Sequence, residues 1–176
     1  MSRRKKLIRN IIILSLICFF FYFTGGYYLS REACIMDSIR SLYCEEDEFI
    51  TSANLNDYDI TLVADLDNKT ASLFSTKRVG FLYRIGDNTT GNKLRKDEPI
   101  VLGGLSSSQF GTAIYIYRND KDIKEVEVAI HNGETVILDD WEKDFILLTF
   151  EDKEKWTHIV GRVYDDNGNL TYETAY

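Results

Sequence analysis

The sequence predicts a mainly β protein, in which an N-terminal transmembrane helix and a short amphipathic helix precede an antiparallel β-sandwich or barrel-like domain. Residues 11–29 form an uncharged, apolar run behind a basic tail. Short apolar or alternating segments then recur roughly every 8–12 residues, with turn-forming residues between them. No second long helical pattern follows, so the spacing favours antiparallel strands over strand–helix–strand units.

The apolar run is predicted to be an uncleaved signal anchor that includes Ile11, Phe20 and Tyr28. A hydrocarbon core about 30 Å thick needs roughly 20 helical residues, which this run supplies. Residues 1–10 carry five basic residues and no acid. The positive-inside bias therefore predicts a single-pass plasma-membrane protein, with a cytoplasmic N-terminus and with the bilayer as the partner of residues 11–29.

A cleaved signal peptide is the alternative to an anchor. Such a peptide has an apolar region of about 7–15 residues followed by small residues. Here residues 27–32 read YYLSRE, where most side chains are bulky or charged. The residues before Cys18 and Cys34 also fit a lipoprotein signal poorly. We therefore expect the anchor to be retained.

The charge of the chain changes sign after the anchor. The whole chain has 21 Lys and Arg and 28 Asp and Glu. Because five of the basic residues lie in residues 1–10, residues 31–176 carry 16 basic and 28 acidic residues, a net charge of −12. A surface of this charge repels nucleic acid and anionic headgroups. It suits basic peptides, cationic polymers or divalent cations, or serves only to keep the domain soluble.

An amphipathic helix and connector are predicted at residues 31–57. Apolar residues recur at helical spacing through Met36, Ile39 and Tyr43, which are candidate interaction residues. The apolar stripe is expected to dock on the β-domain, with self-association through the stripe as the alternative. Residues 51–57 are the expected junction with the β-domain.

The cysteines beyond the anchor are predicted to be free thiols. If residues 33–43 form one helix, Cys34 and Cys44 lie about 15 Å apart along it. A disulfide needs their Cα atoms within about 7 Å. Cys18 lies in the predicted span.

The predicted extracytoplasmic β-domain covers residues 58–176. Loops are expected at residues 65–69, 86–92 and 103–108, and an Asn-Gly hairpin turn is expected near residue 132. The predicted strands alternate in hydropathy or are wholly apolar, and they occupy residues 59–64, 70–75, 79–85, 100–102, 111–117, 123–130, 135–138, 145–150, 157–164 and 170–174.

The sequence has weak signals for catalysis. His131 and His158 stand alone, without a partner at metal-ligand spacing. A hydrolase could use the acidic pair Asp65 and Asp67, or the pair Asp139–Asp140, as catalytic carboxylates. Their alternative interpretation is that they are solvated residues at strand ends. The segment DDNGN at residues 165–169 lacks the later residues of a calcium loop, so a hairpin turn is expected. We predict no catalytic residue, metal or cofactor.

Aromatic residues are the remaining candidates for binding. Trp141 and Trp156 are the two tryptophans, and an exposed aromatic side chain is a common contact for a peptide or glycan. Aromatic residues at alternate strand positions more often fill a sandwich core. Exposure therefore decides whether either tryptophan is an interaction residue.

In the second half, Phe110-Gly111 leads through a strand to DIKEVEV at residues 122–128, and a tryptophan-containing segment precedes GRVYDDNGNL at residues 161–170. Over about residues 110–170 the chain resembles a loose group of small membrane-anchored or lipoprotein extracytoplasmic proteins of Gram-positive bacteria. The resemblance implies a bacterial cell envelope and brings no catalytic residue.

The expected function is that of a membrane-tethered extracytoplasmic binding or accessory protein, without enzymatic activity. Its partner would be a protein of the cell envelope, not a nucleic acid. Two alternatives remain open. One is a cell-envelope hydrolase that uses paired carboxylates. The other is an oligomerising scaffold or an immunity-type protein.

Overall fold

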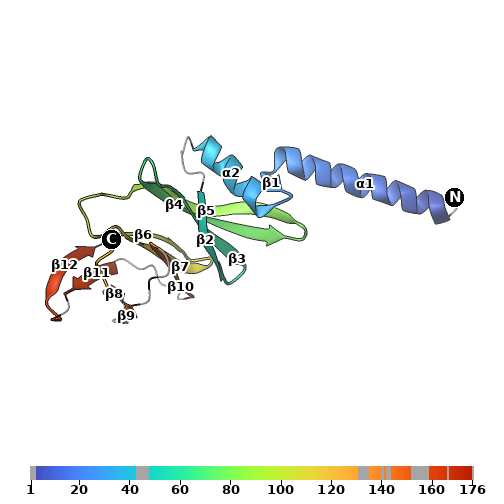
Figure 1. The fold of residues 1–176 in the computed structure, drawn as a ribbon. Helices are drawn as coiled ribbons and strands as arrows, with labels where there is room; N and C mark the ends of the chain where they lie inside the picture. The colour runs from blue at the N-terminus through green and yellow to red at the C-terminus, as the bar shows by residue number, and fades with distance from the viewer. Residues whose placement is uncertain are drawn as a thin grey trace.

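The computed structural model describes residues 3–42, 48–130, 135–139, 141, 144–151, 159–165 and 167–175. These residues form two helices and three antiparallel sheets (Figure 1). Helix α1 (Arg3–Thr24) extends away from the sheets, with the N-terminus at its far end. Helix α2 (Arg31–Ser41) lies against the first sheet. The mainly β prediction is confirmed.

Each sheet is antiparallel throughout. Sheet A has the order β1-β5-β4-β3-β2, with β1 (Tyr27–Tyr28), β2 (Glu48–Leu55), β3 (Tyr58–Asp65), β4 (Thr70–Val79) and β5 (Leu82–Lys93). Sheet B has the order β10-β7-β6, with β6 (Ile100–Ser107), β7 (Gly111–Arg118) and β10 (Phe145–Phe150). Sheet C has the order β12-β11-β8-β9, with β8 (Val126–Ile130), β9 (Thr135–Leu138), β11 (Ile159–Tyr164) and β12 (Leu170–Ala175).

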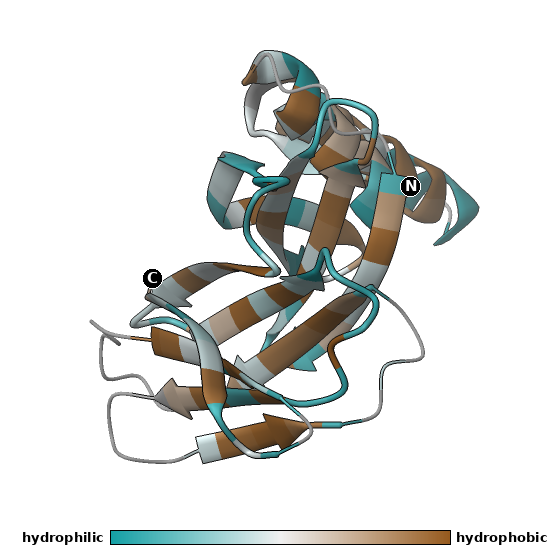
Figure 2. Ribbon diagram, turned by 60° about the vertical axis from the view of Figure 1, so that its left-hand side comes forward, coloured by the Kyte–Doolittle hydropathy of each residue, from teal (hydrophilic) through white to brown (hydrophobic). Residues whose placement is uncertain are grey.

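The layers stack in the order α2, sheet A, sheet B and sheet C. Ile35 and Ile39 of α2 pack on Val63 and Phe74 of sheet A. The largest apolar core lies between sheets A and B, and a second lies between sheets B and C. Figure 2 shows apolar and polar residues banded along the strands. The described strands therefore form a sandwich-like stack and not a closed barrel.

Sheet B is the central layer, which explains its apolar sequences. Successive side chains of a strand point to opposite faces. On β7, Ala113 and Tyr115 enter the core shared with sheet A, whereas Ile114 and Ile116 enter the core shared with sheet C. A strand buried on both faces reads as a continuous apolar run, as GTAIYIY does.

Two glycines allow close packing around sheet B. A Cβ atom on Gly103 of β6 would lie 2.3 Å from the ring of Tyr115, its register partner on β7. A Cβ atom on Gly161 of β11 would lie 3.0 Å from the side chains of Ile100 and Leu102. Gly103 therefore makes room for an aromatic ring, and Gly161 lets sheet C approach sheet B.

The sequence predicts one helix from Ile11 to Leu29, but the structure differs at the end of this run. Helix α1 ends at Thr24, and the amide of Gly25 donates to the Phe21 carbonyl at 3.0 Å. Gly26 follows with a φ of 63°, a left-handed conformation that glycine adopts without strain. Tyr28, predicted to lie in the anchor, instead belongs to β1, where it pairs with Tyr83 of β5.

Two predicted loops are strands. Residues 86–92 lie inside β5, where β4 serines support an irregular register: the Ser75 hydroxyl donates to the Asp87 carbonyl at 2.8 Å, and the Gly91 amide donates to the Ser72 hydroxyl at 3.0 Å. Residues 103–107 of the second predicted loop belong to β6, where Gly103 leaves room for the Tyr115 ring. The loops predicted from the glycine and polar composition of these two segments are therefore wrong.

The predicted connector at residues 31–57 is also partly wrong. Its second half is strand β2, which pairs with β3 along the edge of sheet A. The β-domain therefore includes β1 and β2 and begins well before residue 58. Strand β8 begins at Val126 rather than Ile123, although Ile123 is buried in the core between sheets B and C.

Candidate functional site

Helix α1 presents an apolar surface that no other part of the described chain covers. Its large apolar side chains from Leu7 to Phe23 are 46–66% exposed, including the predicted anchor residues Ile11 at 54% and Phe20 at 63%. None of the residues in its apolar span is buried inside the rest of the chain. The helix is long and apolar enough to cross a membrane.

The junction between α1 and the sheets is short and well connected. The Ser30 side chain accepts a hydrogen bond from the Ala33 amide at 3.1 Å and caps α2. The Tyr28 hydroxyl donates to the Asp37 carboxylate, which raises the pKa of Tyr28 to about 12. Residues 27–30 are therefore part of the folded domain, and the Gly25-Gly26 pair separates it from α1.

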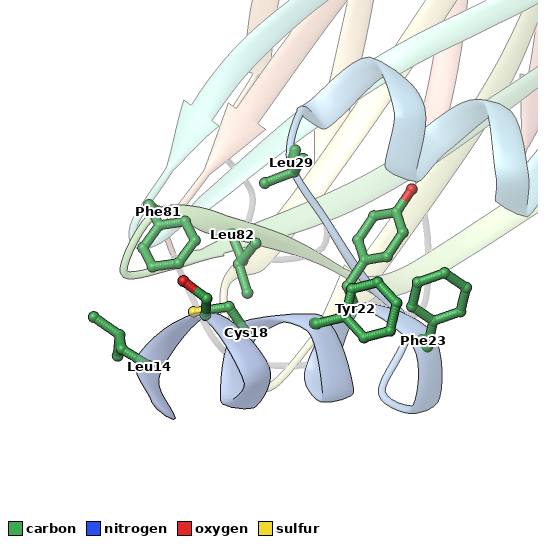
Figure 3. A pocket seen from close by; sticks show the side chains of 9 residues that line it. Leu14, Cys18, Tyr22, Phe23, Leu29, Phe81 and Leu82 are labelled. Carbon is green, nitrogen blue, oxygen red and sulfur yellow. The ribbon is translucent and has the colours of Figure 1, made fainter. Parts of the chain in front are cut away.

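A groove lies between α1 and the tip of the β4–β5 hairpin (Figure 3). It has a volume of about 560 Å³. One wall is the C-terminal half of α1, from Leu14 to Phe23, and the other is formed by Leu29, Phe81 and Leu82. We call it the helix–hairpin groove. Its walls are almost wholly apolar, so it suits hydrocarbon better than a polar ligand.

A second groove lies at the opposite end of sheet A. The register pairs Tyr58 with Lys77 and Asp65 with Thr70, so the β3–β4 turn is at the end away from the β4–β5 tip. This distal groove has a volume of about 550 Å³ and is lined by side chains of both charges and by aromatic rings, among them Glu48, Phe49, Leu66, Lys69, Tyr117, Lys121, Asp144 and Phe145.

Polar and aromatic contacts shape the distal groove. Lys69 Nζ donates to the Tyr117 hydroxyl at 3.2 Å and lies 5.6 Å from the centre of its ring. The rings of Tyr117 and Phe145 pack 4.6 Å apart between their centroids. Phe49 and Leu66 are each 38% exposed at the rim. Aromatic residues with charges of both signs around them are typical of protein interaction surfaces.

The structure assigns the predicted helical stripe to the protein's own core. Ile39 is only 3% exposed and packs with Ile35 on sheet A, and Met36 is half-buried beside them. This confirms docking on the β-domain for the Met36 and Ile39 part of the stripe. Leu42 is 44% exposed and so does not share that buried face. Tyr43 lies outside the described residues.

Trp141 packs at the edge of the core between sheets B and C. It is half-buried, and the Arg118 guanidinium carbon lies 5.0 Å from the centre of its ring. Trp141 therefore contributes to this core, and its role as an interaction residue stays a prediction. Trp156, His131 and His158 lie outside the described residues.

The Asp65 carboxylate, considered for a hydrolase, is engaged within the β3–β4 turn. Asp65 accepts hydrogen bonds from the amide and the side chain of Asn68, each at 2.8 Å, and these bonds lower the pKa of Asp65. Asp67 and Asp139 are exposed, and Asp140 lies outside the described residues. Asp65 therefore holds the β3–β4 turn as an ionised side chain, which is unsuited to a general acid.

The described residues of the DDNGN segment, Asp165 and 167–169, lie in the β11–β12 hairpin turn. Asp165 accepts hydrogen bonds from the amides of Asn167 and Asn169 at 2.9 and 2.8 Å, and bonds from Asn169 lower its pKa. Among the described residues, no group of three or more His, Cys, Asp or Glu side chains is arranged to hold a metal ion. Asp165 thus supports the turn that the sequence predicts.

Cys34 is a buried, free thiol. Burial raises its pKa to about 12, and the nearby Asp37 carboxylate adds to the increase. A thiol with such a pKa is a poor nucleophile at neutral pH. Cys44 lies outside the described residues.

The sequence analysis does not predict either groove. The predicted strand at residues 79–85 contains the β4–β5 turn, whose signal is Gly80 between the apolar residues Val79 and Phe81. The distal groove has no local signal, because its residues come from β2, β7, β10 and the β3–β4 turn.

No protein-family model, curated protein or solved structure matches the chain.

Proposed function

We propose that the protein is a membrane-tethered extracytoplasmic binding or accessory protein that engages another envelope protein through its distal groove. The observation that carries the proposal is the bare apolar surface of α1, 46–66% exposed along its large side chains. In water this surface would drive aggregation, whereas in a bilayer it is solvated by lipid.

The proposed orientation places the N-terminus in the cytoplasm. Five basic residues lie in the first ten, and the β-domain beyond α1 is strongly acidic. Lys and Arg are enriched in cytoplasmic flanks of membrane spans. The resemblance to small envelope proteins of Gram-positive bacteria agrees with this orientation and remains a prediction.

The distal groove supports binding because of where it lies. It is at the end of sheet A opposite the β4–β5 tip, and that tip adjoins α1. A domain tethered by α1 would direct the groove away from the membrane. Its exposed Phe49 and Leu66, with Lys69 and Lys121 nearby, offer apolar area and charge to an extended segment of a partner.

Photo-crosslinking in intact membranes tests the proposal. A photoreactive residue at Leu66 should give a defined adduct with one protein, and Lys121→Glu together with Phe49→Ala should abolish that adduct. A photoreactive residue at Ile137, 58% exposed on sheet C, is the site control, and Lys124→Glu is the charge control. Adducts equally strong from Ile137, or unaffected by the groove substitutions, would contradict binding at the distal groove.

A further inference from the structure

We propose that the tip of the β4–β5 hairpin, residues 79–82, is a second membrane contact that enters the outer leaflet beside α1. Its apolar side chains would lie among lipid acyl chains, and the arginines behind it would bind lipid phosphate groups. This inference rests on the proposed membrane anchorage of α1 and specifies how the β-domain meets the bilayer.

The first observation is that the uncharged part of α1 is shorter than the hydrocarbon core, although the whole helix is long enough to cross it. After Arg9, the last charge of the helix, the uncharged helical residues run from Asn10 to Thr24. At 1.5 Å per residue this stretch rises about 22 Å, whereas the hydrocarbon core is about 30 Å thick. Such a mismatch is met by bilayer thinning, by snorkelling of the basic residues, or by other apolar groups at the membrane surface.

The second observation is the exposed apolar tip. Val79 is 45% exposed, Phe81 is 56% exposed, and Leu29 at the end of β1 is 67% exposed. The turn is formed by Gly80 with a φ of 65°, which leaves the flanking side chains projecting at the tip. Phe81 and Leu82 face the C-terminal half of α1 across the helix–hairpin groove (Figure 3).

The third observation is the charge behind the tip. Arg78 and Arg84 are exposed on β4 and β5, within a few residues of Phe81. Arg78 Nε donates to the Gly80 carbonyl at 3.0 Å, which braces the turn. Apolar residues at a tip followed by arginines match the change from acyl chains to phosphates at a membrane surface. They also contrast with the net charge of −12 over residues 31–176.

Lipid is the occupant that these observations favour for the helix–hairpin groove. One wall of the groove is α1 itself, so a bilayer that surrounds α1 reaches the opposite wall at Phe81 without any further binding event. A second protein chain would instead have to displace lipid from α1. The tip and α1 therefore form one continuous lipid-facing surface.

Quenching by brominated lipids tests this contact in the full-length chain. The chain is reconstituted in phosphatidylcholine–phosphatidylglycerol vesicles with and without bromine on the acyl chains. Three variants each add one indole: Phe20→Trp on α1, Phe81→Trp at the tip, and Leu66→Trp at the opposite end of sheet A. The emission of the two native tryptophans is measured on the unsubstituted chain and subtracted.

We expect loss of the added emission in brominated vesicles for Phe20→Trp and Phe81→Trp, and none for Leu66→Trp. Quenching of Phe20→Trp alone would overturn the hairpin contact and leave the anchorage of α1 standing. Absence of quenching for both would overturn the anchorage as well. Shielding of the Phe81→Trp indole from both brominated lipid and aqueous iodide would show that protein, and not lipid, covers the hairpin tip, which also overturns the proposal.

Discussion

At the scale of single residues, close packing at Gly103 is the tightest constraint in sheet B. A Cβ atom there would lie 2.3 Å from the Tyr115 ring, and Tyr115 is completely buried. We expect Gly103→Ala to lower the free energy of unfolding by about 1–3 kcal/mol, because overpacking forces a buried ring to move. Chemical denaturation measures the change.

A double-substitution cycle separates this clash from a general loss of strand stability. If Tyr115→Leu removes the clash, the two substitutions together should cost less than the sum of their separate effects. Strictly additive effects would contradict the contact between Gly103 and the ring.

Asp65 gives the protein a pH-dependent turn. Its folded-state pKa is lowered by hydrogen bonds from Asn68, while an unfolded aspartate titrates near pH 3.9. Because the folded pKa is the lower one, the stabilisation from the Asp65 carboxylate is complete above the unfolded pKa. It is lost as the pH falls through the folded pKa. Asp65→Asn should therefore lower the melting temperature at pH 6, with the difference shrinking toward pH 2.

Asp67→Asn is the matched control in the same turn, since Asp67 is exposed. Its melting temperature should follow that of the unsubstituted protein across the pH range. A loss of stability for Asp65→Asn that is the same at pH 6 and pH 2 would contradict the role of the ionised carboxylate.

At the scale of elements, α2 is held by its inner face. Ile39 is 3% exposed against sheet A, whereas Leu42 is 44% exposed at the end of the helix. Ile39→Ala should lower the free energy of unfolding by about 2–5 kcal/mol, and Leu42→Ala should change it by less than about 0.5 kcal/mol. Equal small effects would show that the stripe is free for another partner.

The boundary between α1 and the β-domain gives a second prediction for an element. A chain that begins at Gly25 keeps β1 and the Ser30 cap of α2, whereas one that begins at Arg31 loses both. The cap alone contributes about 1 kcal/mol. We expect both chains to be soluble and β-rich by circular dichroism, with a lower melting temperature for the shorter one. Identical melting temperatures would contradict the place of β1 in sheet A.

The elements also show how far the sequence predicts the fold. Strands with clear alternation or apolar runs, such as GTAIYIY in β7, were found at nearly their true bounds. The strands that the sequence does not predict contain glycine and polar residues, which are explained by contacts with other strands. Gly103 lies under Tyr115, and the Ser72 and Ser75 hydroxyls form hydrogen bonds with the backbone of β5. Local composition carries no record of such partners.

At the scale of the whole molecule, the sequence predicts an anchor but not its geometry. The apolar run was found from its length and lack of charge, yet its last residues belong to sheet A because Gly25 and Gly26 end the helix. The two grooves were not predictable, since each is formed by segments distant in sequence. The anchor, the hairpin tip and the distal groove lie in that order along the molecule.

The central claim is that the β-domain lies outside the membrane that α1 crosses. Protease treatment of intact cells that express the chain with a tag at each end tests it most directly. We expect the C-terminal tag to be lost from intact cells while the N-terminal tag remains protected until lysis. A C-terminal tag that is cleaved only after lysis would contradict the account.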